Sequence, residues 1–136
     1  MREAASNQIG FKSAFEQFRA LSNVQEQFGQ THAGVYRTIA LMASLDDTQV
    51  KALRADLARQ VAGIKRAATD VTGAQDATAA TAIAAQSDKY LAQADMAIDM
   101  SSVDPNTGIA ALRGADESFA ALSKTLGEMV ARMDAG

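Results

Sequence analysis

The residues with the clearest capacity for chemistry are His32 and Asp116, because each interrupts an apolar stripe of helical spacing. His32 lies four residues after Phe28 and three before Val35, and Asp116 has the same spacing within its own stripe. Steps of three and four place side chains on one face of a helix, so both residues are predicted to point inward. Such a pair could form an internal ion pair or hydrogen bond that fixes helix register, or it could line a ligand cavity.

A second group surrounds Tyr36 and Arg37. Successive helical residues are turned by about 100°, which places Arg37 almost opposite the core direction of its helix. Beside it runs a strip of small residues, namely Gly29, Ala33, Ala40 and Ala43. Small side chains let a second helix approach closely, so this strip predicts a homodimer formed through the first helix.

Arg37 also has a possible role in ligand binding. Arg113 is expected at a similar depth in the molecule, and the planar guanidinium of arginine matches a carboxylate. Two arginines and Tyr36 near one end of the molecule could therefore bind a carboxylate ligand. The alternative is that both arginines are ordinary solvated surface residues.

Other kinds of chemistry find little support. The chain has no cysteine and a single histidine, which excludes thiolate sites and histidine-pair metal sites. Asp95 and Asp99 stand four residues apart, as in some metal sites, but a solvated acidic face is the simpler interpretation. We therefore expect no metal, no cofactor and no catalytic residues, and an enzyme or metal carrier is the least favoured class.

The composition indicates one helical domain. The chain has 136 residues, of which 48% are hydrophobic and 21% charged, and its net charge of −3 gives no reason to expect nucleic acid as a partner. It contains 30 alanines against 7 valines and 6 isoleucines, and alanine is the best helix former. No apolar run approaches the roughly 20 residues of a membrane span. The fold class is therefore predicted to be all-α.

Four helices follow from the periodicity, over about residues 2–44, 48–72, 77–102 and 105–134. Asp46 or Asp47, Asp76 and Asp104 are predicted N-caps, and Gly73 is predicted to follow the end of the second helix. The three short connections force neighbouring helices to run antiparallel. The prediction is an up-down-up-down four-helix bundle in which the first and fourth helices are the longest and pack side by side.

Three segments resemble the sensory domain of bacterial methyl-accepting chemotaxis receptors of the four-helix-bundle type. They are His32-Ala-Gly-Val-Tyr-Arg-Thr-Ile in the first helix, Tyr90 to Asp104 in the third, and Gly114 to Leu122 in the fourth. The resemblance implies a periplasmic domain of an inner-membrane receptor, placed between two membrane spans that lie outside this chain. It also implies a homodimer and a small-molecule ligand, with transmembrane signalling through the fourth helix.

The resemblance further implies a ligand site built from the first and fourth helices. By position, Tyr36 and Arg37 would contribute from the first helix, and Thr107 and Arg113 from the fourth, beside the inward pair His32 and Asp116. Arg37 is alone where the amino-acid receptors have several arginines, so a small organic acid is the better candidate ligand. The alternatives are the same sensor module on a histidine kinase or a cyclase, and a structural or scaffolding alanine-rich bundle.

Overall fold

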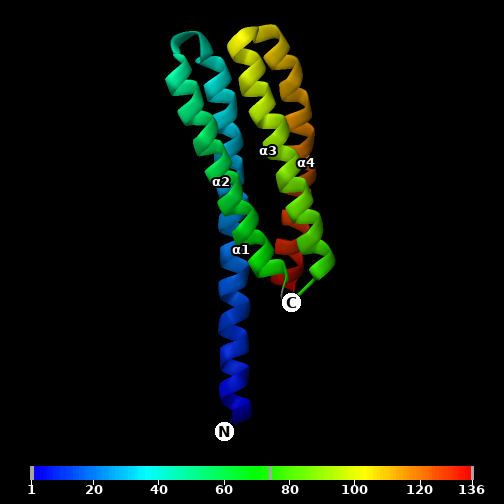
Figure 1. Cartoon of the computed structure of the whole chain (residues 1–136). Coiled ribbons are helices and arrows are strands. Elements are labelled where there is room, and N and C mark those ends of the chain that lie inside the picture. Colours follow the sequence, from blue (N-terminus) through cyan, green and yellow to red (C-terminus); the bar gives the residue numbers. More distant parts are fainter. Residues whose placement is uncertain (1, 74, 136) are drawn as a thin grey trace.

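The computed structural model describes the backbone of residues 2–73 and 75–135, and the side chains of residues 14–73 and 75–133. Its elements are α1 (Arg2–Ala40), the 3₁₀ helix η1 (Met42–Ser44), α2 (Asp47–Gly73), α3 (Ala77–Val103) and α4 (Pro105–Ala135). The helices run alternately up and down, with tight connections at each end (Figure 1). The predicted all-α antiparallel four-helix bundle is confirmed.

The lengths of the helices also follow the prediction. α1 has 39 residues and α4 has 31, whereas α2 and α3 have 27 each. The first helix was expected to continue to residue 44, but α1 ends at Ala40 and the chain tightens into η1. This short 3₁₀ turn brings Met42 into the core before the chain reverses direction.

Three aspartates begin the later helices, as their positions predicted. The Asp46 carboxylate accepts from the Gln49 amide nitrogen at 2.7 Å, and the Gln49 side chain accepts from the Asp46 amide nitrogen at 2.9 Å. This reciprocal pair satisfies two N–H groups that the helix itself leaves free. Asp76 accepts from the amide nitrogen of Ala79, and Asp104 from that of Asn106.

The prediction for Gly73 was wrong. Gly73 is the last residue of α2 rather than a residue beyond it, and no glycine in the described part of the chain has a positive φ. The turn closes instead through two backbone bonds, in which the amide nitrogens of Gln75 and Asp76 donate to the carbonyl oxygen of Thr72. The special conformational freedom of glycine is therefore not used at this turn.

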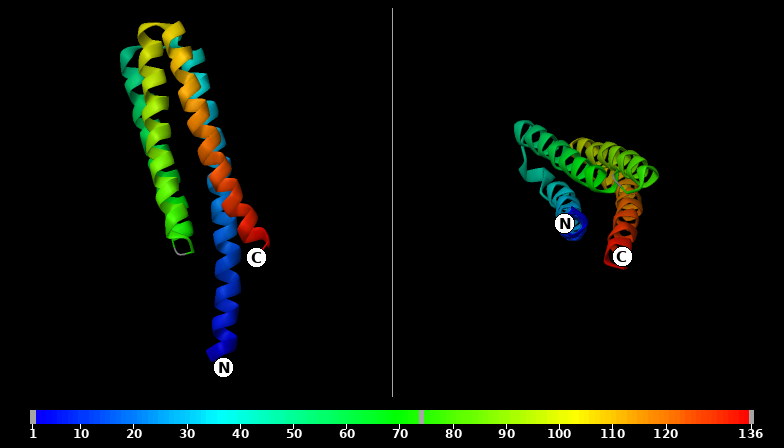
Figure 2. Two further views of the ribbon diagram at one scale, coloured as in Figure 1. Left: turned by 90° about the vertical axis from the view of Figure 1, so that its right-hand side faces the viewer. Right: turned by 90° about the horizontal axis from the view of Figure 1, so that it is seen from below.

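The bundle is closed around a single core. Each helix packs against the next one along the chain, and α1 packs against α4 (Figure 2). The helical spacing of apolar residues explains this arrangement, because every stripe faces inward. The largest fully buried apolar side chains come from α1, α3 and α4: Leu21, Phe28, Ile83, Tyr90, Ile98, Leu122 and Leu126.

α1 extends past the rest of the bundle. The Gln75 side chain, in the α2–α3 turn, donates to the Gln17 side chain, so the part of α1 before Gln17 projects beyond that turn (Figures 1 and 2). Phe15, which the periodicity placed on the inward stripe, is 59% exposed for this reason. Phe11, on the same stripe, lies outside the described side chains. Within the described residues, no helix combines the length and apolarity that a membrane crossing requires.

α3 and α4 approach each other closely at their upper connection. A Cβ atom built on Gly108 would fall 2.6 Å from the Cα atom of Ser101, which is closer than real side chains allow. Glycine is therefore required at position 108 by the backbone of the facing helix rather than by its own φ angle. The Ser101 hydroxyl is buried there and has no hydrogen-bond partner among the described residues.

Candidate functional site

The predicted contact between His32 and Asp116 is present, and it is part of a larger polar cluster. His32 is 8% exposed, and its Nε2 atom lies 2.8 Å from Asp116 Oδ1. Its Nδ1 atom lies 2.7 Å from the hydroxyl of Tyr90, which is fully buried. Tyr36 completes the group, because its hydroxyl donates to Asp116 Oδ2 at 2.5 Å. We call these four residues the polar cluster.

The chemistry of the groups assigns the donors. An ionised carboxylate only accepts hydrogen bonds, so His32 Nε2 donates to Asp116. When the imidazole is neutral, this bond places the proton on Nε2, and Nδ1 then carries a lone pair that accepts from the Tyr90 hydroxyl. Asp116 therefore receives one bond from His32 and another from Tyr36. The bonds connect α3 to α1 and α1 to α4 through a continuous chain.

Aromatic side chains hold the His32 ring in place. The ring stacks on Phe119 with centroids 4.2 Å apart and planes inclined by 12°. Phe28, one helical turn before His32, packs edge-on against Tyr90 with ring centroids 4.8 Å apart. Its ring also lies tilted against Phe119, with centroids 4.6 Å apart. Such contacts add to apolar burial and restrict the ring rotamers. His32 and Tyr90 therefore belong to the core, whereas Tyr36 and Asp116 lie at its partly exposed edge.

The two tyrosines of the chain both lie in the polar cluster, and both favour their neutral forms. The hydrogen bond to Asp116, with smaller contributions from burial and from the carboxylate charge, raises the pKa of Tyr36 above its ordinary value. Burial raises the pKa of Tyr90 strongly, and the negative charge of Asp116 adds to the effect. Neither phenol is therefore activated as a base or nucleophile near neutral pH.

Neither His32 nor Asp116 is among the lining residues of the main hollows between the helices. Two smaller hollows lie along α3 and α4, and two larger ones lie between α1 and α2. One has a volume of about 500 Å³, and a second, of about 340 Å³, shares Thr31, Gly34, Arg37 and Gln60 with it. We call this joined space the α1–α2 groove. Its volume is in the range of small-molecule sites.

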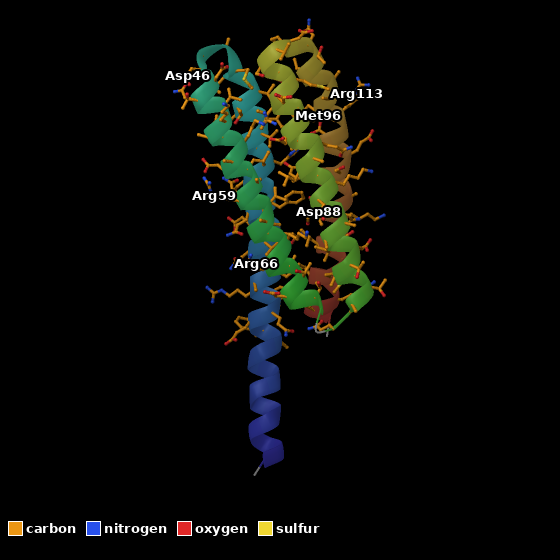
Figure 3. All side chains as sticks on the ribbon, viewed as in Figure 1. Asp46, Arg59, Arg66, Asp88, Met96 and Arg113 are labelled. Carbon is orange, nitrogen blue, oxygen red and sulfur yellow. The ribbon has the colours of Figure 1, made fainter. Side chains whose placement is uncertain are left out.

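The structure separates the residues that were expected to form one site. Tyr36 faces α4, whereas Arg37 lines the α1–α2 groove, because successive helical residues point about 100° apart. Arg113 is exposed and points outward from α4 (Figure 3). Thr107 donates to the Asp104 carboxylate at the start of α4. Tyr36, Arg37, Thr107 and Arg113 thus have different surroundings within one chain, and a ligand site shared by them stays a prediction.

Asp95 and Asp99 do not form a simple solvated acidic face. Both carboxylates bind the guanidinium of Arg54 on α2, Asp95 through two bonds of 2.8 Å and Asp99 through one of 3.2 Å. The bidentate bond to Asp95 raises the pKa of Arg54 further. Among the described residues, no group of three or more histidine or acidic side chains could hold a metal ion. The pair therefore joins α3 to α2.

Sequence reasoning missed Tyr90 as a partner of His32, and it missed the α2 side of the groove, which includes Arg59, Gln60 and Gly63. One signal was available. A glycine inside a helix lowers its stability and often has a packing or functional reason. Gly34 and Gly63 are such residues, and both line the groove.

Comparison with protein-family models, with curated proteins and with solved structures finds no match for this chain.

Proposed function

We propose that this chain is the extracytoplasmic sensor domain of a chemotaxis receptor, which binds a small organic acid and passes the signal through α4. One observation supports this most directly. The three segments that resemble such receptors each contribute to the polar cluster, through His32 and Tyr36, through Tyr90, and through Asp116. Residues far apart in the sequence thus meet in one contact between α1, α3 and α4.

The polar cluster is suited to coupling helix movements. Asp116 on α4 is bonded twice to α1, so a shift or rotation of α1 would change both bonds together. A ligand that binds beside α1 would favour one arrangement of α1 and α4 over the other by its difference in affinity for the two. Small displacements of packed helices are a common form of signalling in bundles.

The placement of the helix ends fits a receptor. The N-terminal end of α1 and the C-terminal end of α4 lie at the same end of the bundle, opposite the α1–α2 and α3–α4 connections (Figures 1 and 2). In the proposed receptor, these two helices would continue into flanking membrane spans. The periplasm would then surround the bundle.

The proposed receptor is a homodimer that meets through α1. Ala33 and Ala40 are exposed on the same side of α1 as Tyr36, where a second α1 could approach closely, and Ala43 is exposed in η1 just beyond. Sedimentation of the purified chain would report the association directly.

A receptor chimera tests the proposed function. The chain would replace the sensor domain of a chemotaxis receptor whose kinase output is measured in cells, with an unaltered receptor as control. We expect small organic acids to change the kinase output of the chimera, and Asp116→Asn to weaken that response while the folded chimera still reaches the membrane. A correctly inserted chimera that responds to no compound in a broad panel would favour a structural bundle instead.

A further inference from the structure

We propose that the α1–α2 groove is the acid-binding site and that it takes a small dicarboxylate held between Arg37 and Arg59. This inference deepens the proposed function, because it names the site and the class of ligand. It also moves the site from the α1–α4 side of the bundle, where Tyr36 lies, to the opposite flank of α1.

Cationic and neutral polar side chains dominate the lining of the larger cavity. It contains two arginines and three glutamine amides, and no carboxylate is among its lining residues: Gln27, Gln30, Thr31, Gly34, Arg37, Arg59, Gln60, Gly63 and Ile64. Two positive charges and a set of neutral donors match a ligand with two negative charges. A dicarboxylate can bind both guanidinium groups at once, whereas a monocarboxylate can bind only one of them.

Arg37 is available for a ligand. It lines both cavities, and no hydrogen bond or ion pair engages its side chain among the described residues. Arg54 of α2, by contrast, already binds the carboxylates of Asp95 and Asp99 on α3. Arg37 is therefore a guanidinium placed beside a hollow without an internal partner.

Arg59 is ion-paired with a carboxylate of its own helix. Asp56, one turn earlier on α2, forms an ion pair with Arg59 and lines the smaller cavity. An exposed pair of this kind contributes little to stability. An incoming carboxylate could therefore displace Asp56 from Arg59 at small cost, and Asp56 would act as a competitor for the ligand.

Two glycines keep the groove open. A Cβ atom added at Gly34 of α1 or at Gly63 of α2 would meet nothing within 4 Å. Elsewhere in the bundle, Gly108, Gly114 and Gly127 pack against side chains or backbone of a facing helix. Gly34 and Gly63 thus leave space that no other side chain fills.

Calorimetric titration of the chain with succinate tests the two arginines. We expect Arg37→Ala and Arg59→Ala each to weaken binding by about tenfold or more, because each removes a charged hydrogen-bonding partner. Arg66→Ala, on α2, is the matched control, because it removes an exposed arginine outside the groove and should leave the affinity unchanged. Succinamide, the neutral analogue, should not bind.

Two further variants separate a binding site from a general electrostatic effect. Asp56→Asn should tighten succinate binding severalfold, because it frees Arg59 and removes a repelling charge. Gly34→Leu should abolish binding by filling the groove, whereas Gly29→Leu, on α1 and also in open space, should not. Circular dichroism would show that each variant is folded.

The outcomes distinguish the groove from the proposed function. If succinate binds and Arg113→Ala or Tyr36→Phe abolishes binding while Arg37→Ala and Arg59→Ala do not, the groove is wrong and the sensor proposal stands. Tighter binding of inorganic phosphate than of any dicarboxylate would overturn the ligand class. If no acid of the series from malonate to glutarate binds, the groove proposal fails, while the chimera still tests sensing of other compounds.

Discussion

At the scale of single residues, His32 shows how one side chain can organise a core. Its two ring nitrogens bind Tyr90 and Asp116, and its face covers Phe119. A buried polar group is costly unless its bonds are made, and here the described partners satisfy both nitrogens. The polar cluster therefore specifies one relative placement of α1, α3 and α4 that apolar contacts alone would define less sharply.

A double-mutant cycle tests the His32–Tyr90 bond. His32→Phe keeps an aromatic ring on Phe119 but leaves the buried Tyr90 hydroxyl unpaired, so unfolding free energy should fall by about 1–3 kcal/mol. Tyr90→Phe should cost about 1 kcal/mol. The double variant should cost clearly less than the sum, as measured by urea unfolding.

Ser101→Ala is the control for that cycle, because its hydroxyl is buried without a described partner and its loss should be nearly neutral. Strict additivity of His32→Phe and Tyr90→Phe would contradict the bond.

The two tyrosines predict an alkaline transition. Because the pKa of each is higher in the folded chain than the value of about 10 expected when unfolded, their protonated forms add stability that is complete below pH 10. That stability is lost as the pH rises through the folded pKa values. We expect tyrosinate absorbance of the folded chain to develop only above pH 10, and Tyr90 to ionise with unfolding.

The absence of tryptophan makes this absorbance titration clear. In Tyr36→Phe, the single remaining tyrosine should ionise together with the loss of helical circular dichroism. In denaturant, both should titrate near the ordinary value. A tyrosine that ionises at or below pH 10 in the folded chain would be inconsistent with the polar cluster.

At the scale of helices, prediction from sequence succeeded where a single helix determines the answer. The spacing of apolar residues and the aspartate caps gave the four helices, and counting residues from the helix ends placed His32 opposite Asp116. It failed where the contacts of a side chain depend on the packing of a neighbouring helix. Tyr36 and Arg37 are adjacent, but Tyr36 points to α4 and Arg37 points to α2. Whether each side chain is paired depends on the distance from α1 to that neighbouring helix.

The space around a glycine shows how closely a neighbouring helix approaches. Substitution by alanine should therefore change the stability of the chain in opposite directions at two glycines. Gly63→Ala should stabilise the chain by about 0.5–1 kcal/mol, because alanine favours the helix and the new methyl group meets open space. Gly108→Ala should destabilise it by more than that gain, because the methyl group would overlap the backbone of Ser101.

Thermal unfolding of the two glycine variants measures both effects in one experiment. A stabilising Gly108→Ala would show that α3 and α4 are farther apart than described. A destabilising Gly63→Ala would show that the groove is filled.

At the scale of the whole molecule, the two flanks of α1 have different roles in this account. One flank bonds to α4 through Asp116, and the other lines the α1–α2 groove with Arg37. Pairing of Asp95 and Asp99 with Arg54 joins α2 to α3 on a further side. The groove depends on the distance between two helices, so the mid-helix glycines Gly34 and Gly63 could mark its walls in the sequence but could not show that the two walls face each other.

The central claim is that this bundle binds a small organic acid, and thermal unfolding of the purified chain against such acids tests it most directly. A ligand at 100 times its dissociation constant should stabilise the chain by about 2.7 kcal/mol, which raises the midpoint by several degrees. We predict such a rise with a dicarboxylate and its loss in Arg37→Ala. A midpoint that no acid in a broad panel changes would contradict the claim.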